Sequence, residues 1–309
     1  MVLQVVQMVL PIVVMLGLGL LCRRKNIFDM NGLAGLKSVV GDICLPVVLF
    51  NAFFTAHYSA TVALTFLLVY AGFGIALAAG FALRRLAAPH DKFFPFLLAS
   101  AEGGMLGYAL YGVLMGEQSG FATVDLGQTV FAYTAFLGFL SLTDGRRPTV
   151  AGLVKNMVTN KCCIGMALGI LLGVLGVGQW VLSSPAAGVA TGAISMITAP
   201  TSALVLLVVG YELDLDKSLL RPVAVTVVCR LAVMAVLLAV VSFVIFQLVP
   251  YDKGLQIALM ILYALPAPFI IPLFADVGKE GKYISTSLSV HTLCTILLFV
   301  AIAAFSLRS

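Results

Sequence analysis

Apolar residues run along this chain in long uninterrupted stretches, and polar residues gather in the short segments between them. Each stretch has about 20 residues, the length that an α-helix needs to cross the hydrocarbon core of a bilayer. Because the apolar positions are continuous rather than alternating, they predict helices and not strands. We expect ten spans, at residues 4–22, 38–56, 61–83, 93–115, 121–142, 160–182, 188–211, 222–248, 254–275 and 283–306.

The composition agrees with a chain that lies almost wholly in a membrane. Hydrophobic residues make up 61% and charged residues only 10%, against roughly 25% charged residues in soluble domains. We therefore expect an all-α polytopic membrane protein without a separate soluble domain. The six cysteines lie in or beside apolar runs without a CxxC pair, so we interpret them as small buried hydrophobic residues.

Basic residues are distributed unequally between the two sets of loops. Fifteen of the 18 Lys and Arg residues fall in the odd-numbered loops, whereas the opposite side has only Lys253 and Arg308. Basic loops stay in the cytoplasm. The imbalance predicts cytoplasmic odd-numbered loops and both termini outside, and it accounts for the net charge of +5 without a nucleic-acid partner.

Ten spans divide into two sets of five, here residues 1–155 and 156–309. An odd number per half makes the second half enter from the opposite side, so a repeat would be inverted, as in many secondary transporters. Weak similarities support this: the run at 15–21 resembles 166–172, and prolines follow at Pro46 and Pro200. Spans 4 and 9 also correspond, since one holds a glycine cluster and the other two prolines.

The most conspicuous stretch is Glu102-Gly103-Gly104 in span 4, followed by further glycines. A carboxylate at bilayer depth is costly and marks a functional site by default. Glycine pairs are places where a membrane helix breaks. We interpret Glu102 as a proton or cation site. The alternative is a structural ion pair with Arg230, which lies well inside span 8.

Span 9 contains Pro266 and Pro268, and each proline removes a helical hydrogen bond. Backbone groups freed at this depth are tolerated only where protein or water satisfies them. If spans 4 and 9 cross at their breaks, the positive ends of half-helices face an anion. Two simple kinks are the alternative reading.

Several other polar residues lie within spans. Asp42 and Asn51 flank Pro46, and Asp125 and Gln128 lie within one turn of span 5; they would line a polar path, or the aspartates would cap helices. His291 lies in the hydroxyl-rich span 10, where such residues usually mediate packing. Sequence signatures of zinc proteases, serine hydrolases, intramembrane aspartyl proteases and nucleotide-binding loops are absent, so we expect neither an enzyme nor a cofactor or metal.

Taken in order, four segments resemble the auxin efflux carrier family, which includes bacterial organic-acid carriers and plant auxin carriers. They are Asp42 to Phe50 in span 2, Glu102 to Leu110 in span 4, Gln128 with Tyr133 in span 5, and Leu265-Pro266 before the hydroxyl-rich span 10. The similarity extends over essentially the whole chain. Two departures stand out, because Ala109 replaces the proline of the family's span 4 and Glu102 replaces its substrate-contacting asparagine.

The resemblance implies ten helices in two inverted five-helix repeats, with broken helices 4 and 9 that cross. It also implies elevator-type carriage of small organic anions by a mobile domain of spans 3–5 and 8–10. Spans 1, 2, 6 and 7 would form a scaffold and the interface of a homodimer. Because an ionised Glu102 repels an anion, it would be protonated when substrate binds, or the substrate is not a simple anion.

We therefore expect a secondary transporter of a small organic acid in the plasma membrane, such as a bacterial inner membrane. The expected substrate-binding residues are Pro46, Val47, Phe50, Asn51, Glu102, Gly103, Gly104, Gln128, Pro266, Ala267 and Pro268. The expected ion-coupling residues are Glu102, Asp125, Arg230 and His291, with H+ as the first choice of ion and Na+ as the second. The alternatives are a sodium-coupled carrier or ion antiporter of the same fold, and a membrane receptor or scaffold that does not transport.

Overall fold

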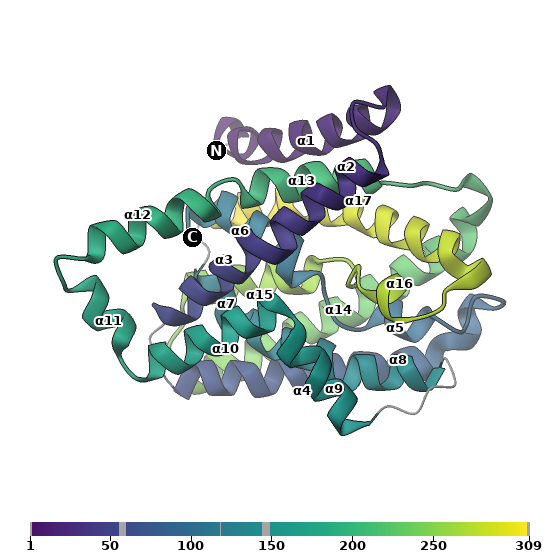
Figure 1. The fold of residues 1–309 in the computed structure, drawn as a ribbon. Helices are drawn as coiled ribbons and strands as arrows, with labels where there is room; N and C mark the ends of the chain where they lie inside the picture. Colours follow the sequence, from purple (N-terminus) through teal and green to yellow (C-terminus); the bar gives the residue numbers. More distant parts are fainter. Residues whose placement is uncertain (1, 56–59, 118, 144–148, 308–309) are drawn as a thin grey trace.

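The computed structural model describes residues 2–55, 60–117, 119–143 and 149–307, and within these ranges the chain is helical without strands. The helices of the first half are α1 (Val2–Lys25), α2 (Met30–Val39), α3 (Leu45–Phe54), α4 (Ala60–Leu83), α5 (Phe94–Leu98), α6 (Tyr108–Met115), α7 (Ser119–Phe131), α8 (Leu137–Thr143) and α9 (Val150–Thr159). Those of the second half are α10 (Lys161–Val174), α11 (Val177–Leu182), α12 (Ala187–Thr198), α13 (Thr201–Glu212), α14 (Leu220–Leu248), α15 (Lys253–Ala264), α16 (Ile271–Phe274) and α17 (Gly281–Ser306). Figure 1 shows the two chain ends at the same end of the molecule.

Seven helices of the described chain are long and apolar enough to cross a membrane, rather than ten. They are Val5–Lys25, Met30–Phe54, Ala60–Ala87, Gly120–Thr143, Ala187–Glu212, Lys217–Leu248 and Gly278–Ser306. The expected spans outside this set are 93–115, 160–182 and 254–275, each of which is divided into shorter helices. Ten crossings and an inverted repeat therefore stay predictions.

The breaks in spans 4 and 9 follow from their sequences. In span 4 the backbone leaves helical geometry between α5 and Gly103, where the glycine pair begins. In span 9, α15 ends at Ala264 and Leu265 is extended at φ −67° and ψ 152°, because a residue before proline avoids the helical region. The division of span 6 lies at Gly176, whose left-handed φ of +73° follows the end of α10.

Three π-helical segments lie inside the expected spans: η1 (Val40–Cys44), η3 (Gly103–Gly107) and η4 (Ala132–Phe136). Span 2 is not broken at Pro46, which follows the π segment η1. The chain passes through η1 into α3, and Pro46 occupies the first turn of α3, where a missing N–H does no harm. By contrast, Ala199 and Pro200 separate α12 from α13 as turn residues.

The helices pack in two groups. In the first group, α1 lies along α13 and α3 lies along α10. Glycines allow these helix pairs to approach through their backbones: Gly19 of α1 lies against the backbone of Gly210, and Gly169 of α10 against the carbonyl of Phe50. Such contacts between small residues are a common way for membrane helices to associate.

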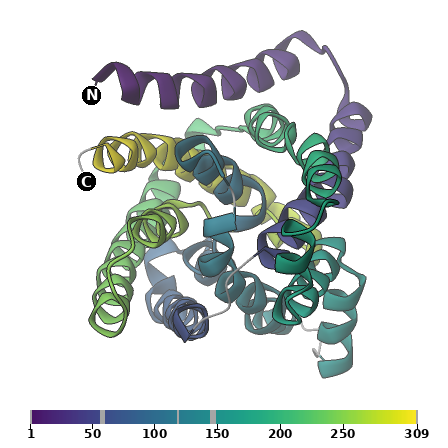
Figure 2. The same cartoon turned by 90° about the vertical axis from the view of Figure 1, so that its left-hand side faces the viewer.

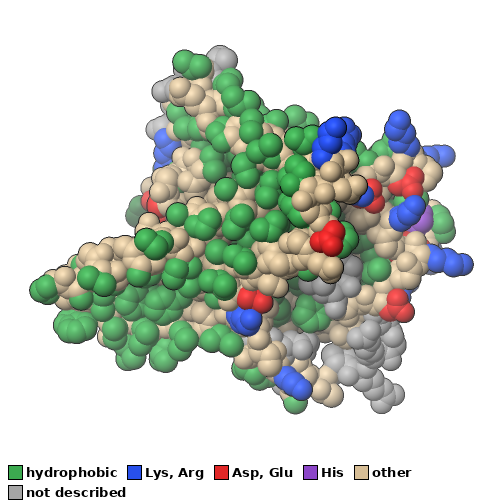
Figure 3. Space-filling model, turned by 45° about the horizontal axis from the view of Figure 1, so that its top comes forward, with side chains coloured by type: hydrophobic (Ala, Val, Ile, Leu, Met, Phe, Trp, Pro, Cys, Tyr) green, Lys and Arg blue, Asp and Glu red, His purple; other side chains and the backbone are tan. Residues whose placement is uncertain are grey.

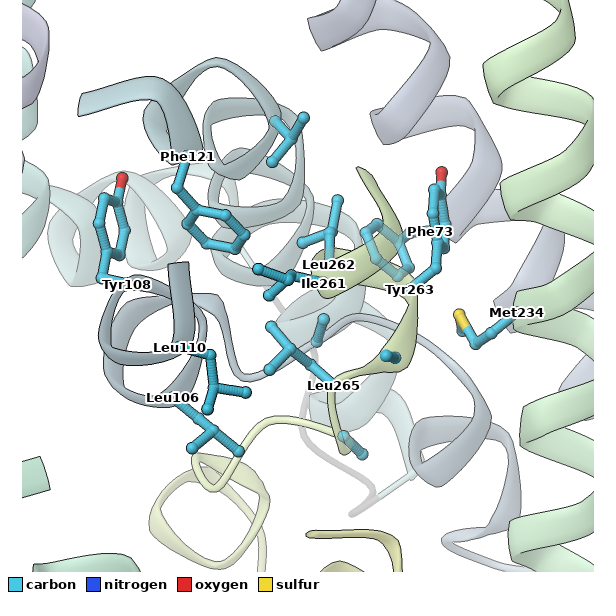
Figure 4. Packing of buried hydrophobic residues seen from close by; sticks show 14 of the residues in the cluster. Phe73, Leu106, Tyr108, Leu110, Phe121, Met234, Ile261, Leu262, Tyr263 and Leu265 are labelled. Atoms are coloured by element: carbon cyan, nitrogen blue, oxygen red, sulfur yellow. The ribbon is translucent and has the colours of Figure 1, made fainter. Parts of the chain in front are cut away.

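The second group is formed by α4, α5, α7, α14, α15 and α17, which contact one another. Figure 2 shows α1 along one edge of the molecule, where α17 is its neighbour from this second group. In Figure 4, buried side chains from α4, α6, α7, α14 and α15 surround the break at Leu265. Gly107 makes room there, because a Cβ at this position would meet the Phe121 ring and lie 3.0 Å from Leu265 Cδ1.

Charged side chains gather toward one end of the molecule, as Figure 3 shows on one face, whereas the remaining surface of that face is mainly hydrophobic. This end carries the odd-numbered loops. Arg23 bonds the Asp214 carboxylate at 3.4 Å, and Lys37 forms an ion pair with Glu212. Both pairs join the ends of α1 and α2 to the end of α13, where the first group of helices meets water.

Candidate functional site

The breaks of the two interrupted spans lie against each other, and Glu102 joins them. Its backbone N–H donates to the Pro266 carbonyl at 3.0 Å. Its carboxylate Oε2 accepts a hydrogen bond of 2.6 Å from the Phe269 N–H. Glu102 is only 7% exposed. The residue therefore ties span 4 to span 9 through both its backbone and its side chain.

Unwound backbone on the span 4 side is held by a side chain of span 5. Gln128 donates through Nε2 to the Ser100 hydroxyl at 3.0 Å and to the Ala101 carbonyl at 2.5 Å. Ser100 is fully buried and has a φ of +60°, a left-handed conformation that costs a non-glycine residue about 1–3 kcal/mol. Strain of this kind persists only where surrounding contacts fix the backbone, as Gln128 does here.

Arg230 of α14 fills the other side of the crossover. Its Nη1 donates to the carbonyls of Leu97 at 3.0 Å and Ala99 at 3.4 Å. Its Nη2 donates to the carbonyls of Ser100 at 2.6 Å and Leu265 at 2.9 Å. Among the described residues it forms no ion pair with a carboxylate, so the alternative of a structural pair with Glu102 is not how this cation is held.

A cavity of about 520 Å³ lies where the two groups of helices meet at the crossover. The π segments contribute Gly41, Gly104 and Tyr133 to its wall, and π turns frequently mark functional sites. Its charged and polar side chains are Lys37, Asp42, Glu102, Asp125, Gln128, Thr129, Tyr133, Asn160, Glu212, Ser285, Ser289 and Thr292. Four of these are carboxylates and one is a lysine, so the cavity is acidic when all of them are ionised.

Asp125 is the second carboxylate at bilayer depth. It is fully buried, and its Oδ2 accepts a 3.2 Å hydrogen bond from the Thr129 hydroxyl. Its Oδ1 has no hydrogen-bond partner within the described part of the chain and lies against the Cα of Gly103. Asp125 and Glu102 thus flank the glycine pair from two different helices.

The expected site residues fall into three places. Glu102, Gly104, Asp125, Gln128 and Pro268 line the cavity. Gly103 and Pro266 belong to the crossover but are not in the cavity wall. Ala267, Arg230 and His291 line a separate space of about 10 Å³. A role for these residues in binding or coupling stays a prediction.

The expected residues of span 2 are placed differently. Pro46, Val47, Phe50 and Asn51 lie outside the cavity wall, which α3 instead reaches with Leu45 and Leu49. The carbonyls of Pro46 and Phe50 face the glycines of α10. Sequence position alone does not fix which face of a helix turns to a cavity, and the π turn of η1 shifts that face.

Some lining residues carry no strong sequence signal. Lys37 and Glu212 lie at span ends, where charges are ordinary, and Asn160 caps α10 through the Cys163 N–H. Asn160 also donates to the Tyr133 hydroxyl at 2.9 Å. That hydrogen bond joins η4 of the second helix group to the start of α10. By contrast, Tyr133 and the hydroxyl-rich span 10 are already conspicuous in the sequence, as polar positions within apolar runs.

Interrupted apolar helices around a polar cavity are typical of proteins that move solutes across membranes. Residues 4–150 match the model of a family described as membrane transport protein. This family is that of the auxin efflux carriers, so the resemblance is confirmed over these residues, which make up just under half of the chain. The match and the long apolar helices together indicate a multi-pass membrane protein with a transporter-type first half. No curated protein matches the chain.

Proposed function

We propose that the protein is a secondary transporter of a small organic acid in the plasma membrane, coupled to protons through Glu102. One observation carries the proposal. The Glu102 carboxylate faces a cavity of about 520 Å³ while it accepts the N–H of Phe269 in the other broken span. The Glu102 carboxylate thus occupies, inside the cavity, the Phe269 N–H that an organic anion could otherwise use as a donor.

Protonation of Glu102 reconciles an acidic cavity with an anionic substrate. Two like charges about 4 Å apart repel by roughly 1 kcal/mol in water and about 4 kcal/mol near a protein surface. A proton on Glu102 removes this repulsion and weakens its acceptance from Phe269, which leaves that N–H to the substrate carboxylate. Proton and substrate then enter together.

Substitution of Glu102 by Gln tests the coupling. In proteoliposomes, wild-type uptake of labelled mono- or dicarboxylates should increase when the outside is acidified. The Glu102→Gln variant should lose this response because its side chain cannot titrate, while it still exchanges substrate across both faces. Asp42→Asn is the matched control: Asp42 lines the cavity but pairs with Lys161 at 3.1 Å on an exposed surface. If uptake by Glu102→Gln responded to pH as the wild type does, Glu102 would not be the proton-coupling residue.

The packing supports an elevator movement of one helix group against the other. The proposed scaffold consists of spans 1, 2, 6 and 7, and the proposed mobile domain of spans 3–5 and 8–10, with the inverted halves at 1–155 and 156–309. Glycine contacts join backbones inside the scaffold, whereas the cavity lies between the groups. A homodimer through the scaffold belongs to the same proposal.

The residues of the cavity wall support an opening toward the cytoplasm. Lys37 and Glu212 line it, and their side chains are 44% and 36% exposed at the end with the odd-numbered loops. With basic loops in the cytoplasm, the described conformation faces inward. Both termini then lie outside the cell.

A second candidate is cation transport, or coupling to Na+, by the same fold. The observation that favours it is the acidity of the cavity, in which four carboxylates accompany one lysine. Carboxylates are common ligands of hard cations. Uptake that requires sodium, with no response to a pH gradient, would support this candidate against the first.

A further inference from the structure

Breaking two helices inside the membrane exposes carbonyl groups that have no helical partner. These are the last carbonyls of each first half-helix, where the partial negative charge of the helix also accumulates. Water is absent from the hydrocarbon core, so the carbonyls need a donor from the protein or a cation. The structure brings the carbonyls of both breaks to one place.

Arg230 meets this need for both breaks at once. Three of its hydrogen bonds go to the end of α5 and one to Leu265 at the end of α15. The side chain is 1% exposed. A guanidinium is the suitable cation for such a site, because it offers five planar donors and keeps its charge in proteins.

A small space behind the guanidinium completes the environment. It measures about 10 Å³ and is lined by Arg230, Thr226, Ser287 and His291. In the described structure Arg230 Nε, Ser287 Oγ and both ring nitrogens of His291 lack hydrogen-bond partners. One water molecule needs a space of about 10–15 Å³ and two to four polar partners. The space therefore suits a single water that bonds Arg230 from behind.

We propose that Arg230 is the resident cation of the crossover, a positioning residue that holds both broken helices where a carrier would otherwise need a bound metal ion. The side chain is permanent, so the crossover stays assembled through the transport cycle without sodium or potassium. This differs from a coupling role, in which the group would gain and lose its partner in each cycle. It does not depend on the class of substrate.

The wild-type protein gives a first test. Its thermal unfolding midpoint without substrate should be the same in sodium, potassium and choline chloride at equal ionic strength. A wild-type protein whose midpoint is raised by sodium specifically would overturn the proposal. A failure of proton coupling in Glu102→Gln leaves this result unaffected, so the two proposals fail separately.

Removing the guanidinium gives the second test. Arg230→Ala should unfold about 5–10 °C lower and should regain stability and uptake when millimolar ethylguanidinium is added. Ethylurea, which has the same shape without charge, should not restore them. Arg230→Lys should be intermediate because it keeps the charge with fewer donors. Arg221→Ala, an exposed arginine at the start of the same helix, is the matched control and should respond to neither additive.

Two outcomes would count against the resident cation in this second test. One is Arg230→Ala with wild-type stability and uptake. The other is a folded Arg230→Ala that ethylguanidinium and ethylurea restore equally, since a purely space-filling role predicts equal rescue. If Arg230→Ala does not fold, Arg230→Lys and the salt comparison on the wild type still decide the matter.

Discussion

At the scale of single residues, Gly103 is held more tightly than its neighbour Gly104. A Cβ on Gly103 would meet Asp125 Oδ1 and lie 3.1 Å from Gln128 Oε1, both of which are buried. We expect Gly103→Ala to destabilise the protein by about 1–3 kcal/mol, because overpacking pushes these two side chains from their places. Thermal unfolding in detergent measures the change.

Gly104→Ala is the matched control, because nothing lies within 4 Å of a Cβ at that position. It should unfold at nearly the wild-type temperature. Since Gly104 lines the cavity, its added methyl group should instead alter uptake. Equal destabilisation by the two substitutions would contradict the close contact of Gly103 with Asp125.

Whether the sequence alone identifies a site residue depends on the kind of partner that the residue has. A carboxylate beside glycines in an apolar run is conspicuous, so Glu102 is found. Arg230 is equally conspicuous, but its partners are backbone carbonyls, which the sequence does not reveal. The alternative reading, in which Arg230 pairs with a carboxylate, does not describe how it is held among the described residues. The position of Gln128 is predicted, whereas its hydrogen bonds to Ser100 and Ala101 depend on the unwound backbone.

At the scale of helices, the contact between α1 and α13 depends on Gly19. A Cβ there would meet backbone atoms of Leu207, Gly210 and Tyr211, none of which can turn aside. Gly19→Ala should therefore separate the two helices and lower the unfolding free energy by about 1–3 kcal/mol. Gly17, two residues earlier, has nothing within 4 Å of a Cβ. Gly17→Ala is the control, and a similar loss in both variants would contradict the tight helix pair.

Helix ends and breaks differ in how well the sequence predicts them. The expected span 61–83 corresponds to α4, and 283–306 to α17, because these runs are apolar and contain no proline. The glycine pair and Pro266 correctly predict interruptions. Pro46 causes no break, since a proline in the first turn after a π segment lets the helix continue. No residue type in η4 predicts a π-helical turn. We attribute its widened turn to packing against neighbouring helices.

At the scale of the whole molecule, the proposed inward-facing orientation of the cavity predicts which thiol a reagent reaches. Cys162 lines the cavity, whereas its neighbour Cys163 is buried away from it. In single-cysteine variants, a membrane-impermeant thiol reagent should label Cys162 much faster in inside-out vesicles than in right-side-out vesicles. Cys163 should react slowly in both. Labelling of Cys162 only from the outer face would reverse the proposed orientation.

Overall architecture was predictable to the extent that it depends on apolar length and charge. Long apolar runs predict a helical membrane protein, and the basic loops predict one charged end, which the structure has. The cavity was not predictable in this way, because it lies between helices far apart in sequence, such as η1, η3 and η4. Its wall depends on which helix faces meet, and neither span boundaries nor loop charges determine that.

Arg230 also imposes an order on the making of the protein. The carbonyl of Ser100 accepts a hydrogen bond from Arg230, which lies 130 residues further along the chain. At 5–20 residues per second, the ribosome makes the intervening segment in roughly ten seconds. During that time the first broken span cannot rest stably in lipid by itself. It must stay in the insertion machinery, or beside water, until α14 arrives. Slowing translation between the two segments should therefore increase degradation of the newly made chain.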